Sequence, residues 1–191
     1  MFSRRPDCLV VSEPEGTLSF NREDMIRYAG HGQIIASGVV FRLLQKAFMD
    51  LSPQEPPSRK DIWVLTAFPG EGVRDCIELV TRAVTDGRFT LDVNVAPSGA
   101  PSSPIGGGMY FEVGYRGKAF AYTFNPEIFD EHWYQSVQNF QDGCDSSENH
   151  GRYVSYKYGV LGELLAREDV FIDVHECCAD RVLKIKSSTL K

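Results

Sequence analysis

Apolar residues recur at spacings of three and four along residues 34–50, and this run constrains the fold more than any other feature of the chain. They are Val39, Val40, Leu43, Leu44, Ala47, Phe48 and Leu51. Such spacing places them on one face and predicts a buried helix over 34–50. Pro53, Pro56 and Pro57 follow, and they predict the end of the helix and a rigid connection up to Lys60.

Two further helices are indicated by their first turns. Asn21, with an acidic residue three positions later, is a helix-capping pattern and predicts a short helix over 22–29. Strand-forming residues over 62–68 lead through Gly70-Glu71-Gly72 into apolar residues at helical spacing over 73–83. This order predicts a buried strand and a helix joined by a glycine-rich turn.

Three later segments, 89–95, 110–115 and 119–124, have the alternation that is typical of strands. Arg116-Gly117 separates the last two and predicts a hairpin. Residues 96–108 are rich in Pro, Gly and other small residues, which predicts a mobile loop. A lid over a cleft and an insertion without a role are both open interpretations of it.

The rest of the chain predicts a further small set of elements. They are a helix that starts at Asn125-Pro126 and runs through Val137, a polar surface connection over 141–150, a helix over 158–166, and strands over 170–175 and 181–185. The resulting fold class is α+β, a mainly antiparallel sheet with helices packed on one face. We expect a core over residues 1–140 and a small C-terminal extension of helix and strand over 141–191.

Composition excludes several functional classes. The 191 residues carry a net charge of −6, without the basic excess that nucleic-acid binding requires. No apolar run approaches the roughly 20 residues of a membrane span. No signal peptide is expected at the N-terminus. The five cysteines are odd in number and irregularly spaced, which favours free thiols and a cytoplasmic location.

Two glycine-rich turns are candidate binding elements. His31, between Gly30 and Gly32, has a side chain that can bind a metal or transfer protons, although helix caps and a structural histidine explain the turn as well. Gly70-Glu71-Gly72 at a helix start offers free N–H groups to an anionic ligand. It lacks the lysine and hydroxyl of a phosphate loop, so a plain turn is the alternative.

Cysteine and histidine side chains are the other candidates. Cys76 lies in the first turn of a predicted helix, where a thiol pKa tends to fall, but a small core residue is the commoner role. His175 and Cys177 would share one face of a strand within His175-Glu176-Cys177-Cys178. No Cys-x-x-Cys knuckle occurs, so they indicate at most part of an open or shared zinc site.

Three motifs in order resemble those of the formylmethanofuran dehydrogenase E-subunit family over about residues 27–130. Gly30-His31 with Arg42 resembles the turn that opens the family's long helix. Residues 72–81 with Gly87 resemble its Cys-x-x-Asp helix start, and residues 117–125 resemble its Gly-Lys-x-Ala-Tyr-Thr-Phe strand. Gln33 and its neighbours stand in place of the family's Cys-Pro, and Gly72 stands in place of its helix-opening Cys.

The resemblance implies an accessory metal- or small-ligand-binding protein linked to C1 or redox metabolism. It implies a homodimer, and partners among the subunits of molybdenum or tungsten dehydrogenases. The expected ligand-binding cleft consists of His31, Gln33, Gly70, Gly72, Asp75 and Tyr122. With the pair near the C-terminus included, the expected metal ligands are His31, Cys76, His175 and Cys177, and zinc is the expected ion.

The sequence leaves two other functions open. His31 and Asp75 could form a general acid–base pair of an enzyme, provided that their side chains lie within hydrogen-bond reach. The chain could instead be a structural adaptor with a degenerate metal site, because two of the family's thiol ligands are missing.

Overall fold

A five-stranded sheet organises the computed structural model, which describes residues 7–141 and 147–183. Its strand order is β4 (Phe89–Leu91), β3 (Ile62–Thr66), β5 (Tyr110–Tyr115), β6 (Lys118–Phe124) and β7 (Phe171–Cys177). Only β3 and β4 are parallel, and the other three pairs are antiparallel. The predicted α+β class is confirmed, and so is the β5–β6 hairpin.

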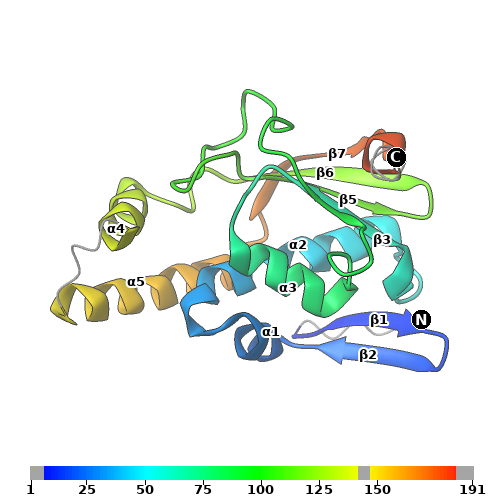
Figure 1. Ribbon diagram of the computed structural model, residues 1–191, viewed down its shortest axis with the longest axis horizontal. Helices are drawn as coiled ribbons and strands as arrows, with labels where there is room; N and C mark the ends of the chain where they lie inside the picture. The colour runs from blue at the N-terminus through cyan, green and yellow to red at the C-terminus, as the bar shows by residue number, and fades with distance from the viewer. Residues whose placement is uncertain (1–6, 142–146, 184–191) are drawn as a thin grey trace.

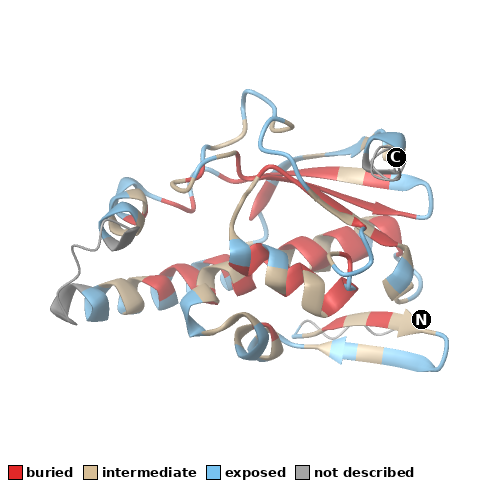
Figure 2. Cartoon of the chain, viewed as in Figure 1, coloured by how far each residue is buried: buried red, intermediate tan, exposed pale blue. Residues whose placement is uncertain are grey.

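Helices α2 (Ile34–Leu51) and α3 (Glu71–Thr81) pack against one face of this sheet (Figure 1). The main core lies between these two helices and the sheet. Its buried residues include Leu43 and Leu44 of α2, Ile77 of α3 and Phe111 of β5. Figure 2 shows buried residues concentrated in α2 and in the central strands. The helix predicted over 34–50 is therefore confirmed, with its apolar stripe turned toward the sheet.

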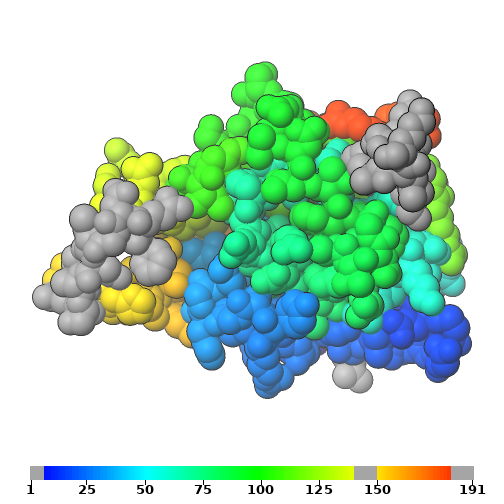
Figure 3. All heavy atoms as spheres, in the orientation of Figure 1, coloured from blue at the N-terminus to red at the C-terminus, as the bar shows by residue number. Residues whose placement is uncertain are grey.

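The opposite face is covered by Val95, Ala96 and Ala100 of the segment drawn in green in Figures 1 and 3, and by the short helix α6 (Ala179–Leu183). Residues 96–108 were predicted to be a mobile loop, and their backbone is tied at several points, for example by Met109 N donating to Pro101 O. Gly107 has a φ of +68°, and a side chain there would overlap the carbonyl of Ala67. The segment thus packs directly on the sheet.

Strand β4 is shorter than the predicted strand 89–95. A turn follows it, because Asp92 accepts a hydrogen bond from Asn94 N through its side chain, and one from Val95 N through its carbonyl. An aspartate of this kind competes with strand pairing by bonding to the backbone two residues ahead. The prediction was wrong for residues 92–95.

The N-terminal part forms a separate two-stranded hairpin, β1 (Leu9–Glu13) and β2 (Gly16–Phe20), which no sequence pattern predicted. Helix α1 (Arg22–Ala29) follows, and its predicted cap is confirmed. Asn21 Oδ1 accepts from Asp24 N, and Asp24 Oδ2 accepts from Asn21 N. A single 3₁₀ turn, η1 (His31–Gln33), then leads into α2.

Helices α4 (Glu131–Gln141) and α5 (Ser147–Ala166) extend to one side of the sheet in Figure 1. Helix α4 begins later than predicted, because Asp130 caps it by accepting a hydrogen bond from Trp133 N. Helix α5 includes residues 147–150 of the predicted surface connection, whereas residues 142–146 lie outside the described residues. It packs closely on α2, where a Cβ on Gly38 would lie 2.7 Å from Leu161.

Residues of the predicted C-terminal extension complete the same sheet and core. Strand β7 is confirmed and pairs with β6 at the edge of the sheet. A register shift interrupts this pairing, and Asp173 within β7 has a φ of +49°. The strand predicted over 181–185 is wrong for 181–183, which belong to α6 and are held by Arg181 N donating to Cys178 O; residues 184 and 185 lie outside the described residues.

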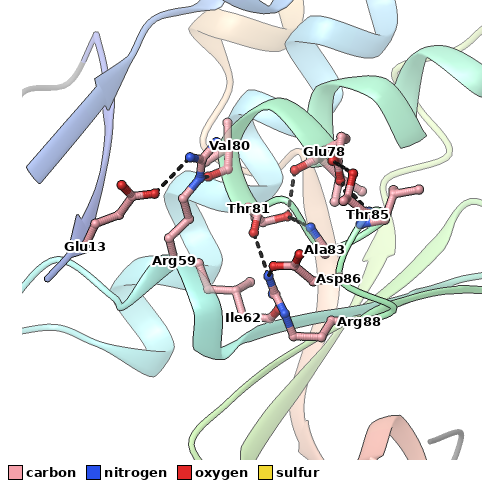
Figure 4. Close-up of polar contacts among 12 residues, drawn as sticks. Glu13, Arg59, Ile62, Glu78, Val80, Thr81, Ala83, Thr85, Asp86 and Arg88 are labelled. Atoms are coloured by element: carbon pink, nitrogen blue, oxygen red, sulfur yellow. Dashed lines mark hydrogen bonds and ion pairs between the residues drawn. The ribbon is translucent and has the colours of Figure 1, made fainter.

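Two arginines bind the C-terminal end of α3 (Figure 4). Arg59 donates from Nε to Val80 O over 2.9 Å, and Arg88 donates from Nη2 to Thr81 O over 2.9 Å. Arg82 ends the helix in the left-handed conformation with a φ of +53°. Cationic groups at this end satisfy free carbonyls and interact favourably with the helix dipole. Among the described residues, no helix is both long and apolar enough to span a membrane.

Candidate functional site

The first turns of α2 and α3 meet at Gln33 and Gly72. Gln33 is the N-cap residue of α2, and Gly72 is the second residue of α3. A Cβ on Gly72 would overlap the side-chain carboxamide of Gln33, so the absence of a side chain at Gly72 permits this contact. Neither helix has a side-chain hydrogen bond that caps its first turn. The first backbone N–H groups of a helix lack partners within it and carry partial positive charge, so two positive helix ends lie together here.

Lys157 of α5 adds a full positive charge beside η1, next to the start of α2. Its Nζ donates to the carbonyl of Gly32 over 3.4 Å and lies 4.7 Å from the ring centre of Tyr153. The residue is only 7% exposed, and no carboxylate of the described residues pairs with it. Burial lowers the pKa of the Lys157 ammonium. We refer to Lys157, Gly32, Gln33 and the first turn of α3 as the helix-start site.

Three other residues of the predicted ligand-binding set have different environments. His31 is exposed on η1, and Asp75 is half-buried on α3, with no hydrogen bond between the two. Gly70 is the N-cap of α3, and a side chain there would overlap the ring of Phe68. The acid–base hypothesis therefore has no contact between its two residues to support it.

Tyr122 lies at the far end of α2. Its hydroxyl donates to Asp50 Oδ2 over 3.0 Å, and its ring is buried in the main core. Asp50 is separated from Gln33 by most of the length of α2, about 25 Å at 1.5 Å per residue. Tyr122 therefore cannot share one small cleft with Gln33 and Gly72. Burial and Asp50 both raise the pKa of the Tyr122 phenol.

The thiol of Cys76 does not fit the predicted zinc site with His31. Cys76 is buried in the core beneath α3, and burial, with a smaller contribution from Asp75, raises its pKa to about 12. Zinc is bound by the thiolate form of cysteine. A helix start was expected to lower this pKa, but the loss of solvation in the core has the larger effect. We derive no chemistry through zinc at this pair.

His175 and Cys177 lie on β7, with Ala121 and Ala119 as their partners on β6. His175 is exposed and its Nδ1 lies 3.1 Å from the carbonyl oxygen of Asp173. Burial, together with the charge of Glu112, raises the pKa of the half-buried Cys177 to about 11. Within residues 7–141 and 147–183, no three His, Cys, Asp or Glu side chains are arranged to hold a metal ion.

A buried polar cluster beneath α6 was not predicted from the sequence. Glu112 of β5 accepts a hydrogen bond from the Tyr110 hydroxyl over 2.7 Å and forms an ion pair with Arg181 of α6. Its second carboxylate oxygen is buried without a partner among the described residues. A glutamate within an otherwise apolar strand was the only signal in the sequence.

Lys157 was also missed, although its position carries a signal. It stands among Tyr153, Val160, Leu161 and Leu164, which follow it or precede it at helical spacing and include buried residues. A lysine within an apolar stripe indicates either a side chain that extends to solvent or a buried charge. Only the packing of α5 on η1 decides between them.

The chain has no match among protein-family models and none among curated proteins. The resemblance to the E-subunit family of formylmethanofuran dehydrogenase therefore stays a prediction, carried by its three motifs. The contacts and charges of the site itself are the basis for inferring its function.

Proposed function

We propose that this protein binds a small ligand through an anionic group at the helix-start site. The observation that carries the proposal is the ammonium of Lys157, which is 7% exposed and pairs with no carboxylate of the described residues. A buried charge without a counter-ion costs free energy. An anionic ligand next to Lys157 would remove that cost.

The backbone around Lys157 supports the same chemistry. The uncapped first turns of α2 and α3 offer N–H donors and the positive ends of two helix dipoles. The Gln33 carboxamide has its oxygen, an acceptor, nearest to Gly72, so only its NH2 group can act as a neutral donor to an anion. A carboxylate, formate or phosphate group has the charge and the acceptor atoms that such donors bind.

Two acidic residues of α3 oppose an anion. Glu71 is exposed in the first turn, and Asp75 is half-buried one turn later. The side of the site that favours an anion is therefore the side of Gly32 and Lys157. Removal of the Glu71 charge should strengthen anion binding, so a Glu71 variant is expected to bind the anion more tightly than the wild type.

The wider role that we propose is that of an accessory small-ligand-binding protein in C1 or redox metabolism. Its support is the resemblance to the E-subunit family, which also leads us to propose a homodimer that serves a molybdenum or tungsten dehydrogenase. We propose a cytoplasmic location, supported by Cys8, Cys76, Cys177 and Cys178, all of which are free thiols.

The test is thermal unfolding of the full chain with sodium phosphate or sodium formate, compared with chloride at the same ionic strength. A ligand at ten times its Kd stabilises the folded state by about 1.4 kcal/mol, or about 3–5 °C in Tm. We expect this shift in the wild type, a larger one in Glu71→Gln, and none in Lys157→Met. Lys118→Met removes an exposed lysine elsewhere and is the matched control.

An equal response of Lys157→Met and the wild type would contradict the proposal. No response of the wild type to either anion would instead favour the structural adaptor.

A further inference from the structure

A cavity lies between β1, α2 and the start of β7, and no residue of the helix-start site lines it. Its volume is about 620 Å³, within the usual range of small-molecule pockets. Its apolar wall includes Leu9, Val10, Phe48, Met49, Val170 and Phe171. Neither His31 nor Asp75 lines it. We call it the β1–α2 cavity.

One stripe of α2 supplies the cationic side chains of this cavity. Arg42, Gln45, Lys46 and Met49 follow each other at spacings of three, one and three, so they lie on one face of the helix. Arg42 and Met49 are seven residues apart, or about 10 Å along the helix axis. The cavity therefore has a cationic end and an apolar end.

The two cations of the stripe differ in their partners. Lys46 Nζ lies 2.6 Å from Asp50 Oδ1, and the Tyr122 hydroxyl donates to the same carboxylate, so the Lys46 charge is neutralised within the fold. Arg42 donates to two neutral acceptors, the Gln45 side-chain oxygen and the carbonyl of Arg167. Among the described residues, no carboxylate pairs with Arg42.

Two glutamates also border the cavity. Glu55 follows α2 and is 3.9 Å from Arg116, and Glu168 is exposed close to Arg167, whose carbonyl Arg42 binds. Both are surface groups that water can solvate, so they do not replace a counter-ion inside the cavity. The partly buried guanidinium of Arg42 remains the group with unused capacity for an anion.

We propose that the β1–α2 cavity binds an amphipathic monocarboxylate of medium chain length. The carboxylate pairs with the Arg42 guanidinium, which matches a carboxylate in geometry and charge. The hydrocarbon chain lies along α2 toward Met49, and the apolar wall excludes water from it. This site is independent of the helix-start site, and its test does not depend on the proposed function.

Calorimetric titration of the full chain with octanoate and with 1-octanol tests the pairing. We expect octanoate to bind more tightly than octanol, and Arg42→Met to weaken octanoate about 10-fold or more while octanol changes little. Arg42→Lys keeps the charge and should recover part of the affinity. Lys60→Met, an exposed cation outside the cavity, is the control.

The rate of Cys8 alkylation reports whether octanoate binds in this cavity, and its measurement needs no substitution. Its half-exposed thiol lines the cavity, whereas Cys178 is exposed and lies outside it. Octanoate should slow the alkylation of Cys8 by iodoacetamide, measured by peptide mass spectrometry, and leave the rate at Cys178 unchanged. Met49→Glu places a carboxylate at the apolar end and should remove this protection.

Three results would overturn the proposal. The first is that octanoate does not bind or does not protect Cys8. The second is that Arg42→Met weakens the affinity for octanoate and for octanol equally. The third is that Cys8 becomes protected without octanoate as the protein concentration is raised, because a second copy of the chain then covers it.

Discussion

Arg181 Nη2 lies 2.6 Å from Glu112 Oε1, and this ion pair joins α6 to the centre of the sheet. The Glu112 side chain is 1% exposed and the Arg181 side chain is 48% exposed, so the pair runs from the interior to the surface. Tyr110 donates to the same Glu112 oxygen over 2.7 Å. The charge of Glu112 is thus compensated mainly by one side chain from the last described helix.

The substitution Arg181→Met should destabilise the protein, because it leaves a buried carboxylate without its cation. We expect a loss of about 2 kcal/mol in the free energy of unfolding, measured by urea denaturation. The double variant Arg181→Met with Glu112→Gln should recover much of the lost free energy of unfolding. Arg27→Met, which breaks an exposed ion pair with Asp24, should change stability by less than about 0.5 kcal/mol. An Arg181→Met effect no larger than that of Arg27→Met would contradict the inference.

Lys157→Met should be more stable than the wild type at pH 7, by about 1–2 kcal/mol, because it removes a buried charge. Burial lowers the pKa of Lys157 below its ordinary value of 10.5, so between the two pKa values the unfolded state binds more protons than the folded state. The free energy of unfolding of the wild type therefore rises as the pH approaches 10.5, and the extra stability of Lys157→Met becomes smaller. Urea unfolding at pH 7 and pH 10 checks this. A clear loss of stability at pH 7 would mean that the lysine is structural.

Gly72→Ala should destabilise the protein by about 1–2 kcal/mol, because the added methyl group overlaps the Gln33 side chain. The double variant Gly72→Ala with Gln33→Ala should recover most of this, since it removes the overlapping atoms and gains helix propensity. Gly87, with a φ of +66° and no atom within 4 Å of an added Cβ, provides a comparison in which an alanine is strained by the backbone alone. Additive effects of the two substitutions in urea unfolding would show that α2 and α3 do not touch at this point.

Cys76 should resist alkylation in the native protein, whereas Cys178 reacts. The thiol of Cys76 is buried and its pKa is about 12, so little thiolate is present at pH 8. Labelling with iodoacetamide, with and without urea, measures this difference. Elemental analysis of the untagged protein beside His31→Ala and Cys76→Ala should give the same metal content for Cys76→Ala as for the wild type. Stoichiometric zinc that is lost in Cys76→Ala would restore the predicted metal site.

The elements that were predicted well from the sequence are those whose signals are local. The stripe of α2 and the cap at Asn21 depend on neighbouring residues, and each gave the right element within a residue or so. The errors arose where a side chain binds the backbone or where partners are distant. Asp92 ended β4 early through its own turn, and the first hairpin offered only a short apolar segment around Leu9 and Val11.

The candidate site was predictable only in part. A shared cleft requires the turn at Gln33 to lie beside the helix start at Gly72, and these two residues are in contact. Tyr122 and Cys76 both lie in the core, and their burial depends on the packing of α2 and α3 on the sheet, which a local pattern does not predict. Lys157 reaches the site from α5, 125 residues along the chain from Gly32. No local pattern reports such a separation.

Strand β7 is an edge of the sheet, and its outer backbone groups face away from β6. The register shift beside β6 and the left-handed backbone of Asp173 break the regular row of donors and acceptors near the middle of that edge. Bulges of this kind prevent one protein from extending the sheet of another. The irregularity therefore acts against open-ended self-assembly through β7, because a second chain would find no continuous row of backbone partners along this edge.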